Sequence, residues 1–188
     1  MKKKMISFVL AAMTVTSLCA GDINVKSGDV SVVKNPNNLA TIQFSYAQTL
    51  VEGKPLMEYL KERGDEFVKD WPKESQVCEK AFYRRWNSKN KKGLKLTDNP
   101  NVPYRMIITV DKLDLGSFAS SFLVGFGAGG ARMSGTIEIY EKEKNICLLT
   151  LTINNQTGHS AYTEQKRRAD LYKELVDDVI EVIKEIKQ

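Results

Sequence analysis

Two segments of the chain have the hydrophobic pattern of β-strands. In residues 40–51, Ile42, Phe44 and Tyr46 alternate with polar residues. A period of two places successive side chains on opposite faces of a sheet, so one face of this strand is expected to be buried. Residues 104–115 carry apolar side chains on both faces. That pattern indicates a central strand, covered on both sides or flanked by other strands.

Two further alternating runs, residues 131–140 and 145–153, stand on either side of a charged turn. A short turn that joins two alternating runs is typical of a β-hairpin. Residues 94–97 come before an Asp-Asn-Pro turn and predict a short edge strand. The second half of the chain is therefore expected to be rich in antiparallel strands.

Helical spacing appears in three places. Residues 56–70 predict one helix, the pair Trp71 and Pro72 is expected to break it, and residues 73–88 predict a second. From Thr163 onward the helical pattern is the clearest in the chain. Its apolar stripe consists of Tyr172, Leu175, Val176, Val179, Ile183 and Ile186.

This order of elements predicts an α+β fold. It runs strand, helix, helix, short edge strand, three strands and a final helix. Strands that cluster late, with helices before and after them, favour an antiparallel-rich mixed sheet of about four to five strands with helices packed on one face.

The N-terminus resembles an export signal. Lys2, Lys3 and Lys4 form a basic start, residues 5–15 are apolar but too short to span a bilayer, and Ala20 is suited to signal-peptidase cleavage. We therefore expect residues 1–20 to be a signal peptide, residues 21–38 a flexible leader and residues 39–188 a single domain in the periplasm or cell envelope.

Cys19 leaves a second form open. Lipoprotein signals end in a cysteine that becomes the lipid-modified N-terminus, although the residue before it is normally small and here is Leu18. Cleavage after Ala20 is the expected route, and lipidation of Cys19 would instead anchor the protein to a membrane.

The net charge gives little support for nucleic-acid binding. It falls from +5 to +2 when the three lysines of the signal are removed. Basic residues around Trp86 are interleaved with aromatics, but cations are also favoured at the C-terminus of a helix. We expect no nucleic-acid partner.

Cleavage would leave two cysteines, Cys78 and Cys147. In an oxidising compartment they could form a disulfide. They could equally be two small buried thiols, because one falls in a predicted helix and the other in a predicted strand.

Residues 125–130, GFGAGG, match the dinucleotide fingerprint G-x-G-x-x-G. The fingerprint requires a helix after the glycines to receive the pyrophosphate, and here a strand is predicted to follow. A tight approach to the strand is the better interpretation. We expect no nucleotide or other cofactor.

The connection that contains these glycines, residues 116–130, has no charged residue. A connection that crosses the surface is normally polar, so this one is either core or an exposed apolar contact site. It is too short to span a membrane as a helix. The candidate contact residues for a protein partner or a membrane surface are Phe118, Phe122, Leu123, Phe126 and Arg132.

Residues suited to catalysis are few. His159 is the sole histidine, and its neighbour Ser160 is not placed to pair with it in a strand or a helix. One histidine and two mature cysteines give no zinc-binding spacing, and no metal site is expected. Asp111 and Asp114 would point to opposite faces of a strand.

The glycine-rich stretch also carries a family resemblance. Gly116 and residues 125–135, GFGAGGARMSG, followed by a hairpin and a final helix, resemble a group of uncharacterised exported bacterial proteins, a domain of unknown function often found on lipoproteins. The chain departs from that group at its hairpin turn, Glu-Lys-Glu-Lys-Asn in place of an Asp…Thr-Gly signature, and at its imperfect lipobox. The resemblance implies an envelope location and an α+β fold, but no activity.

Together these features favour a non-enzymatic envelope protein that binds a protein partner or self-associates through residues 116–130. One alternative is a module that binds a small molecule or lipid, with this segment as a lid. A weaker alternative is a hydrolase that uses His159.

Overall fold

The computed structural model describes residues 23–116, 129–159, 161 and 163–186. The described part is built on one eight-stranded sheet in the order β1-β8-β7-β6-β2-β5, with β3 beside β6 and β4 beside β3. The strands are β1 (Ile23–Gly28), β2 (Leu39–Ser45), β3 (Leu50–Val51), β4 (Lys54–Pro55), β5 (Lys95–Leu96), β6 (Tyr104–Asp114), β7 (Arg132–Glu141) and β8 (Ile146–Thr157).

The sheet is mixed. β6, β7, β8 and β1 run antiparallel to one another in that order, whereas β2 is parallel to both β6 and β5. The predicted hairpin is β7–β8, and the predicted edge strand is β5. The first predicted strand, residues 40–51, is divided: β2 ends at Ser45, and the chain turns before the small hairpin β3–β4. The sheet therefore has more strands than expected.

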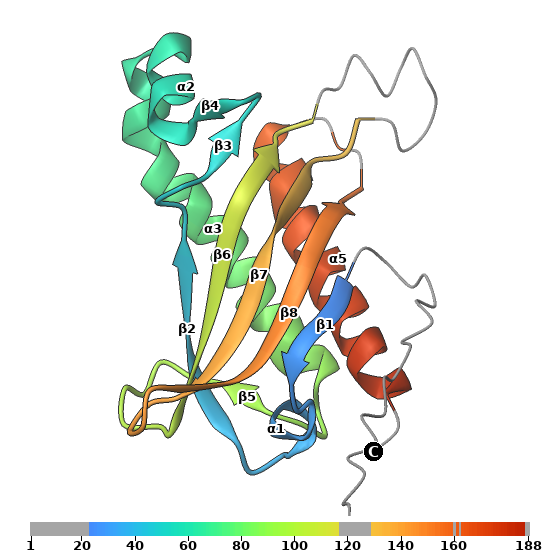
Figure 1. Cartoon of the computed structure of the whole chain (residues 1–188). Helices are drawn as coiled ribbons and strands as arrows, with labels where there is room; N and C mark the ends of the chain where they lie inside the picture. The colour runs from blue at the N-terminus through green and yellow to red at the C-terminus, as the bar shows by residue number, and fades with distance from the viewer. Residues whose placement is uncertain (1–22, 117–128, 160, 162, 187–188) are drawn as a thin grey trace, which may run out of the picture.

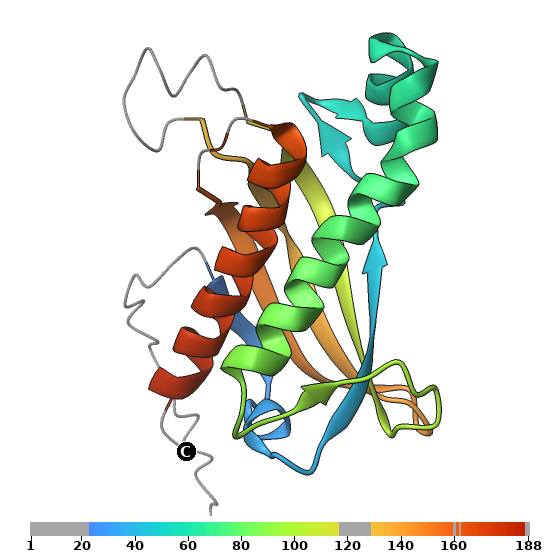
Figure 2. The same cartoon turned by 180° about the vertical axis from the view of Figure 1, so that it is seen from behind.

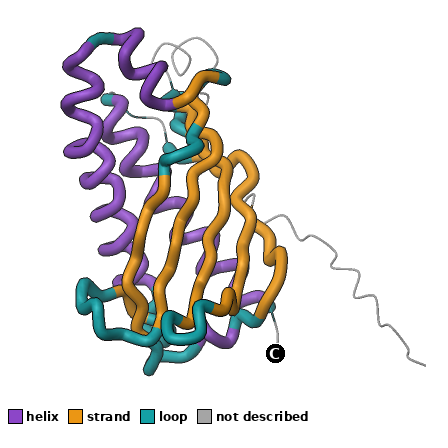
Figure 3. Tube along the Cα trace, turned by 60° about the vertical axis from the view of Figure 1, so that its left-hand side comes forward, coloured by secondary structure: helices purple, strands orange, loops and turns teal. Residues whose placement is uncertain are grey.

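The described helices are α1 (Ser31–Lys34), α2 (Leu56–Arg63), α3 (Asp65–Lys89) and α5 (Glu164–Glu185). α3 and α5 lie side by side across one face of the sheet (Figures 1 and 2). The opposite face is covered by no described helix (Figure 3). This arrangement confirms the predicted α+β class and the placement of helices on one face.

The core lies between the sheet and these two helices. Met106 and Ile108 of β6 and Ile137 of β7 are buried on the helical face, in the same hydrophobic core as the predicted stripe of α5. Phe44 of β2 contacts Phe82 of α3, with 5.6 Å between ring centres. Each large apolar side chain buried in this layer contributes about 1.5–3 kcal/mol to folding. None of the described helices is both long enough and apolar enough to cross a membrane.

The expected flexible leader is largely part of this domain. β1 pairs with β8 at the edge of the sheet, and Val32 and Val33 of α1 are buried. The Leu94 amide donates to the carbonyl oxygen of Val33 at 2.8 Å. The polar sequence hides this edge strand because one side of β1 faces solvent.

The break between the first two long helices lies earlier than the sequence predicts. Gly64, with φ 132° and ψ 157°, separates α2 from α3, and Pro72 lies inside α3. That backbone conformation is open almost only to glycine. Pro72 lacks an N–H for the helix and normally kinks or ends it, but here Trp71 and Ser75 on the same helix are buried. Burial of the flanking turns outweighs the local cost of the proline.

Cys78 and Cys147 are both free thiols. Cys78 is buried on α3, whereas the Cys147 sulfur lies 3.4 Å from the Thr150 hydroxyl on the face without helices. The sheet lies between the two cysteines, so the disulfide considered above is not formed.

Candidate functional site

A cavity of about 380 Å³ lies where β6 ends and β7 begins, beside the β3–β4 hairpin. Figure 1 shows these strand ends and the hairpin at the same end of the sheet. We call it the sheet-end pocket. Its lining comes from the β3–β4 hairpin, β6, β7 and β8 and consists of Leu50, Glu52, Gly53, Lys112, Leu113, Asp114, Arg132, Met133, Ser134 and Asn155.

The sheet is irregular at this pocket. The β6–β7 register shifts between Val110 and Lys112, and the β7–β8 register shifts between Met133 and Gly135. An extra residue in a strand bends it and redirects the side chains that follow, and such bulges are frequent next to binding sites. Here the β6–β7 shift places Lys112 and Ser134 opposite each other at the pocket.

Two non-glycine residues in the pocket have left-handed backbones, Glu52 at φ 52° and Asn155 at φ 54°. Glu52 and Gly53 form the two-residue turn of the β3–β4 hairpin, which favours Asn or Asp before glycine. A glutamate there is held at a local cost. The Asn155 amide donates to the Ser134 hydroxyl at 3.0 Å, which fixes the strained residue against β7.

The pocket is lined by two carboxylates, Glu52 and Asp114, and two cations, Lys112 and Arg132, that do not pair directly with one another. Within the described residues, Lys112, Arg132 and Glu52 form no ion pair and their side chains form no hydrogen bond, although Asp114 is the register partner of Arg132. The Asp114 carboxylate instead accepts the Gly116 amide at 2.8 Å. An arginine beside a lysine with no carboxylate bound to either is suited to bind an anionic group.

Arg167 holds the end of β6 against α5. This buried guanidinium donates from Nε to the Leu115 carbonyl at 3.1 Å, from Nη2 to the Gly116 carbonyl at 3.1 Å, and from Nη1 to the Ala161 carbonyl at 2.9 Å. The point where the uncharged connection leaves the sheet is therefore fixed to the helix next to the pocket. Charge-assisted bonds of this kind are stronger than neutral ones.

The predicted contact residues are divided by this structure. Arg132 lines the pocket, whereas Phe118, Phe122, Leu123 and Phe126 lie outside the described residues, as do the expected signal peptide and Cys19. Sequence reasoning missed Lys112, Asn155 and Arg167. An arginine on the sheet-facing side of an amphipathic helix was a signal that could have indicated Arg167.

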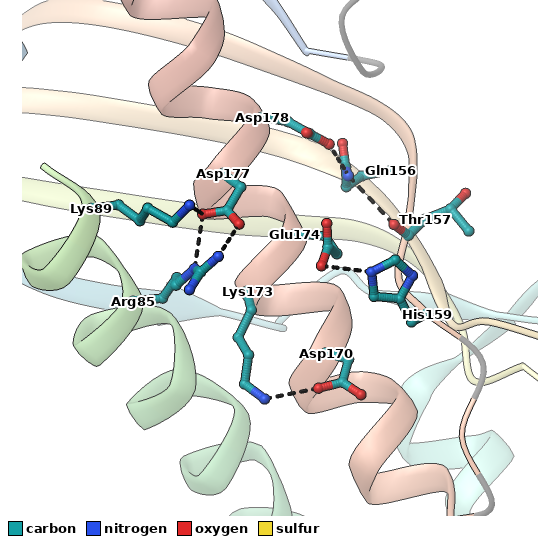
Figure 4. A network of polar contacts seen from close by, with 10 residues as sticks. All are labelled: Arg85, Lys89, Gln156, Thr157, His159, Asp170, Lys173, Glu174, Asp177 and Asp178. Carbon is teal, nitrogen blue, oxygen red and sulfur yellow. Dashed lines mark hydrogen bonds and ion pairs between the residues drawn. The ribbon is translucent and has the colours of Figure 1, made fainter.

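A second polar region lies on α5 (Figure 4). His159 Nε2 is 3.0 Å from Glu174 Oε1, and the histidine side chain is 77% exposed. Figure 4 shows the His159 ring directed at the Glu174 carboxylate. Ser160, which follows His159 in the sequence, lies outside the described residues.

On the same helix, Asp177 accepts Arg85 and lies 3.6 Å from Lys89. Burial alone would raise the pKa of Asp177, but the hydrogen bond and charge of Arg85 lower it below its ordinary value. Gln156 Nε2 donates to Asp178 at 2.5 Å. These contacts join α5 to α3 and to β8. No group of three or more His, Cys, Asp or Glu residues in the described ranges could hold a metal ion.

No protein-family model and no curated protein matches the chain. Solved structures that match this chain include a PelC dodecamer from Paraburkholderia phytofirmans. The match has a TM-score of 0.46 and 10% sequence identity, and it covers 84% of this chain and 98% of that chain. A second PelC dodecamer from the same organism gives a TM-score of 0.44 at 10% identity, over 84% and 95%. A protein from Xanthomonas campestris, described under the family model DUF330, gives 0.33 at 12% identity, over 84% and 87%. The family resemblance of the glycine-rich stretch stays a prediction.

Proposed function

We propose that this protein is an exported, non-enzymatic domain of the cell envelope that binds a protein partner at the sheet-end pocket and the adjoining residues 116–130. Export rests on the pattern of residues 1–20. Binding rests on one observation: Arg132 lines a cavity without an ion-pair or hydrogen-bond partner among the described residues.

The chemistry of the pocket favours an acidic side chain of the partner. A guanidinium presents paired N–H groups that match a carboxylate, and Lys112 adds a second cation. Such a contact next to an uncharged aromatic segment has the composition of an interface centre, where arginine and aromatic residues are enriched. The bulges and the Arg167 contacts hold the surface in place before the partner arrives, which reduces the ordering cost of binding.

A second candidate is a small polar ligand, favoured by the volume of the cavity. About 380 Å³ falls within the range of roughly 300–1,000 Å³ typical of small-molecule sites. A lipid tail is a poorer match, because Glu52, Lys112, Asp114 and Arg132 all line the cavity.

The test is a crosslinked pull-down of the tagged full chain from envelopes of its native cell, read by mass spectrometry. Arg132→Glu should abolish recovery of a partner that the unchanged chain recovers in near-equal amount, and so should the double change Phe122→Ser and Phe126→Ser. Lys26→Glu is the matched control, because Lys26 is an exposed cation on the edge strand β1, and it should leave recovery intact.

Thermal unfolding of each variant separates lost binding from lost folding, and Arg132→Gln replaces Arg132→Glu if the latter unfolds. Recovery that survives loss of Arg132 in a folded chain contradicts the proposal. If no partner depends on Arg132 but native mass spectrometry finds a small molecule that Arg132→Gln loses, the second candidate replaces the first.

A further inference from the structure

A second cavity, of about 460 Å³, lies at the opposite end of the molecule from the sheet-end pocket. There the C-terminal ends of α3 and α5 meet α1 (Figures 1 and 2). We call it the lysine groove. Its lining is Val33, Lys34, Lys89, Asn90, Lys91, Lys92, Ile180, Ile183 and Lys184.

The groove contains five lysines and no carboxylate. Two of them have partners: Lys34 Nζ donates to the Ile186 carbonyl at 2.5 Å, and Lys89 shares Asp177 with Arg85 (Figure 4). Lys91, Lys92 and Lys184 are exposed and form no ion pair or hydrogen bond through their side chains in the described part of the chain. Three full charges therefore face the solvent at one place.

Stabilisation of the helix ends accounts for only part of this charge. Each helix C-terminus carries a partial charge of about −0.5, so α3 and α5 together present roughly −1. Alone, the three lysines without a partner in the described part of the chain exceed that by about two charges. Such an excess at a concave surface indicates an external anionic partner.

The basic surface continues along the helical layer. A hollow of about 680 Å³ between α3 and α5 is lined by Lys80, Arg84, Arg85 and Lys173, beside the exposed Val77. Arg85 is bound by Asp177 and Lys173 by Asp170, whereas Arg84 has no partner in the described ranges. Lys80 and Arg84, which form no ion pair in the described ranges, thus add cations along the outer side of the helices.

The kind of cation selects the kind of partner. A lysine is a compact, hydrated point charge on a flexible stem, whereas bidentate recognition of a particular carboxylate or phosphate uses arginine. The lining of the groove also has an apolar part, the buried residues Val33, Ile180 and Ile183. Charges that stand beside apolar residues are suited to a headgroup layer, where each basic residue adds a similar increment of attraction.

We propose that the protein docks on an anionic phospholipid bilayer through the lysine groove, with the helical end of the domain against the headgroups. This contact is separate from the proposed partner site, which lies at the other end of the sheet. A membrane-docked groove leaves the sheet-end pocket directed away from the bilayer and open to a partner.

The experiment is co-sedimentation of the full chain with phosphatidylcholine vesicles, with and without phosphatidylglycerol. The chain should bind the anionic vesicles more tightly, and the binding should weaken as salt rises. The triple change Lys91→Glu, Lys92→Glu and Lys184→Glu should lower the partition coefficient about 100-fold or more, given roughly fivefold per lysine near the surface.

The matched control is Lys61→Glu, Lys69→Glu and Lys73→Glu, which changes the net charge equally at the other end of the helical layer, where these lysines are exposed. It should retain most of the binding, and it corrects for any contribution of the N-terminal apolar residues. Equal losses in both triple variants overturn the proposal. The proposal is also overturned if the protein does not bind anionic vesicles but binds soluble polyglutamate, because the partner is then an acidic polymer. Arg132→Glu should leave vesicle binding unchanged, so this test fails or succeeds independently of the partner site.

Discussion

The guanidinium of Arg168 on α5 lies 4.8 Å from the centre of the Trp71 ring on α3. Arg168 is 1% exposed, and its Nη2 donates to the carboxylate of Glu74, one turn along α3. Nε and Nη1 of the same guanidinium are buried and have no hydrogen-bond partner. A buried cation between the two helices is therefore stabilised by one carboxylate, by the face of an indole ring, and by Glu164 at 3.9 Å.

This arrangement predicts that replacing Glu74 and replacing Arg168 lower the free energy of unfolding by different amounts. Glu74→Ala leaves the buried guanidinium short of its main counter-charge and should lower the free energy of unfolding by about 2 kcal/mol, less than the full cost of a buried pair because Glu74 is partly exposed. Arg168→Met fills the same volume with an apolar chain and leaves Glu74 free to be hydrated, so its cost should be under about 1 kcal/mol. Urea unfolding measures both. Equal losses, or a larger loss for Arg168→Met, would contradict this account.

The two described cysteines should react at different rates. Burial raises the pKa of the Cys78 thiol to about 11, so little thiolate forms near neutrality and the sulfur is covered. Cys147 is exposed. Iodoacetamide at pH 8 should label Cys147 first, and peptide mass spectrometry should find Cys78 labelled only after unfolding. Early labelling of Cys78 in the folded chain would show that the α3–α5 layer opens.

The same thiol predicts a loss of stability in alkali. The folded pKa of Cys78, about 11, is above its ordinary value of 9.0, so the protonated thiol is favoured in the folded state. The contribution of this thiol to the free energy of unfolding is complete below pH 9 and is lost as pH rises toward 11, because the unfolded chain loses the proton at lower pH than the folded one. The loss should reach about 2 kcal/mol between these limits.

The control for this prediction is Cys78→Ala, which removes the titrating group. Burial also raises the pKa of Tyr46 and of Tyr172, whose hydroxyls are 2.7 Å apart. The free energy of unfolding of the unchanged protein and of Cys78→Ala should therefore both fall further above pH 10. Urea unfolding between pH 7 and 11 should therefore give a smaller decline for Cys78→Ala than for the unchanged protein. Parallel curves would mean that the thiol titrates alike in both states.

The junction of α2 and α3 predicts opposite effects at two positions. Gly64→Ala forces a side chain into a conformation that is nearly exclusive to glycine, and should lower the free energy of unfolding by about 2 kcal/mol. Pro72→Ala supplies the missing N–H to the helix at an exposed position and should raise it by about 1 kcal/mol or more. Chemical denaturation decides both. A destabilising Pro72→Ala would show that the proline ring itself is required for packing.

Much of the fold could be predicted from local pattern. The alternation in residues 131–153 identified the β7–β8 hairpin, and the stripe beginning after Thr163 identified α5, where the Thr163 hydroxyl caps the helix by accepting the Lys166 amide at 3.2 Å. Strand β1 was missed, since an edge strand with one solvated side lacks a clear apolar period. The helix break was misplaced because proline propensity favours Pro72, whereas the tertiary packing of Trp71 keeps the helix continuous.

The candidate site was partly predictable. Arg132 stood out because it follows an uncharged aromatic segment, but Lys112 and Asn155 are ordinary polar residues in their local sequence. They reach the same pocket through register shifts in two strand pairs, and such shifts depend on how the strands pair rather than on one strand alone. The lysine groove joins residues of α1, the α3 C-terminus and α5, which are far apart in the chain.

The amino-acid sequence by itself determined the long helices, the β7–β8 hairpin, the α+β class and the buried face of α5, because period and propensity act over a few neighbouring residues. Tertiary structure alone decided which strands are neighbours, where the bulges fall, and which cations lack a carboxylate. Those features depend on how distant segments are placed: Lys112 of β6 and Arg132 of β7 line one pocket, and Lys91 and Lys184 line another where the helices end.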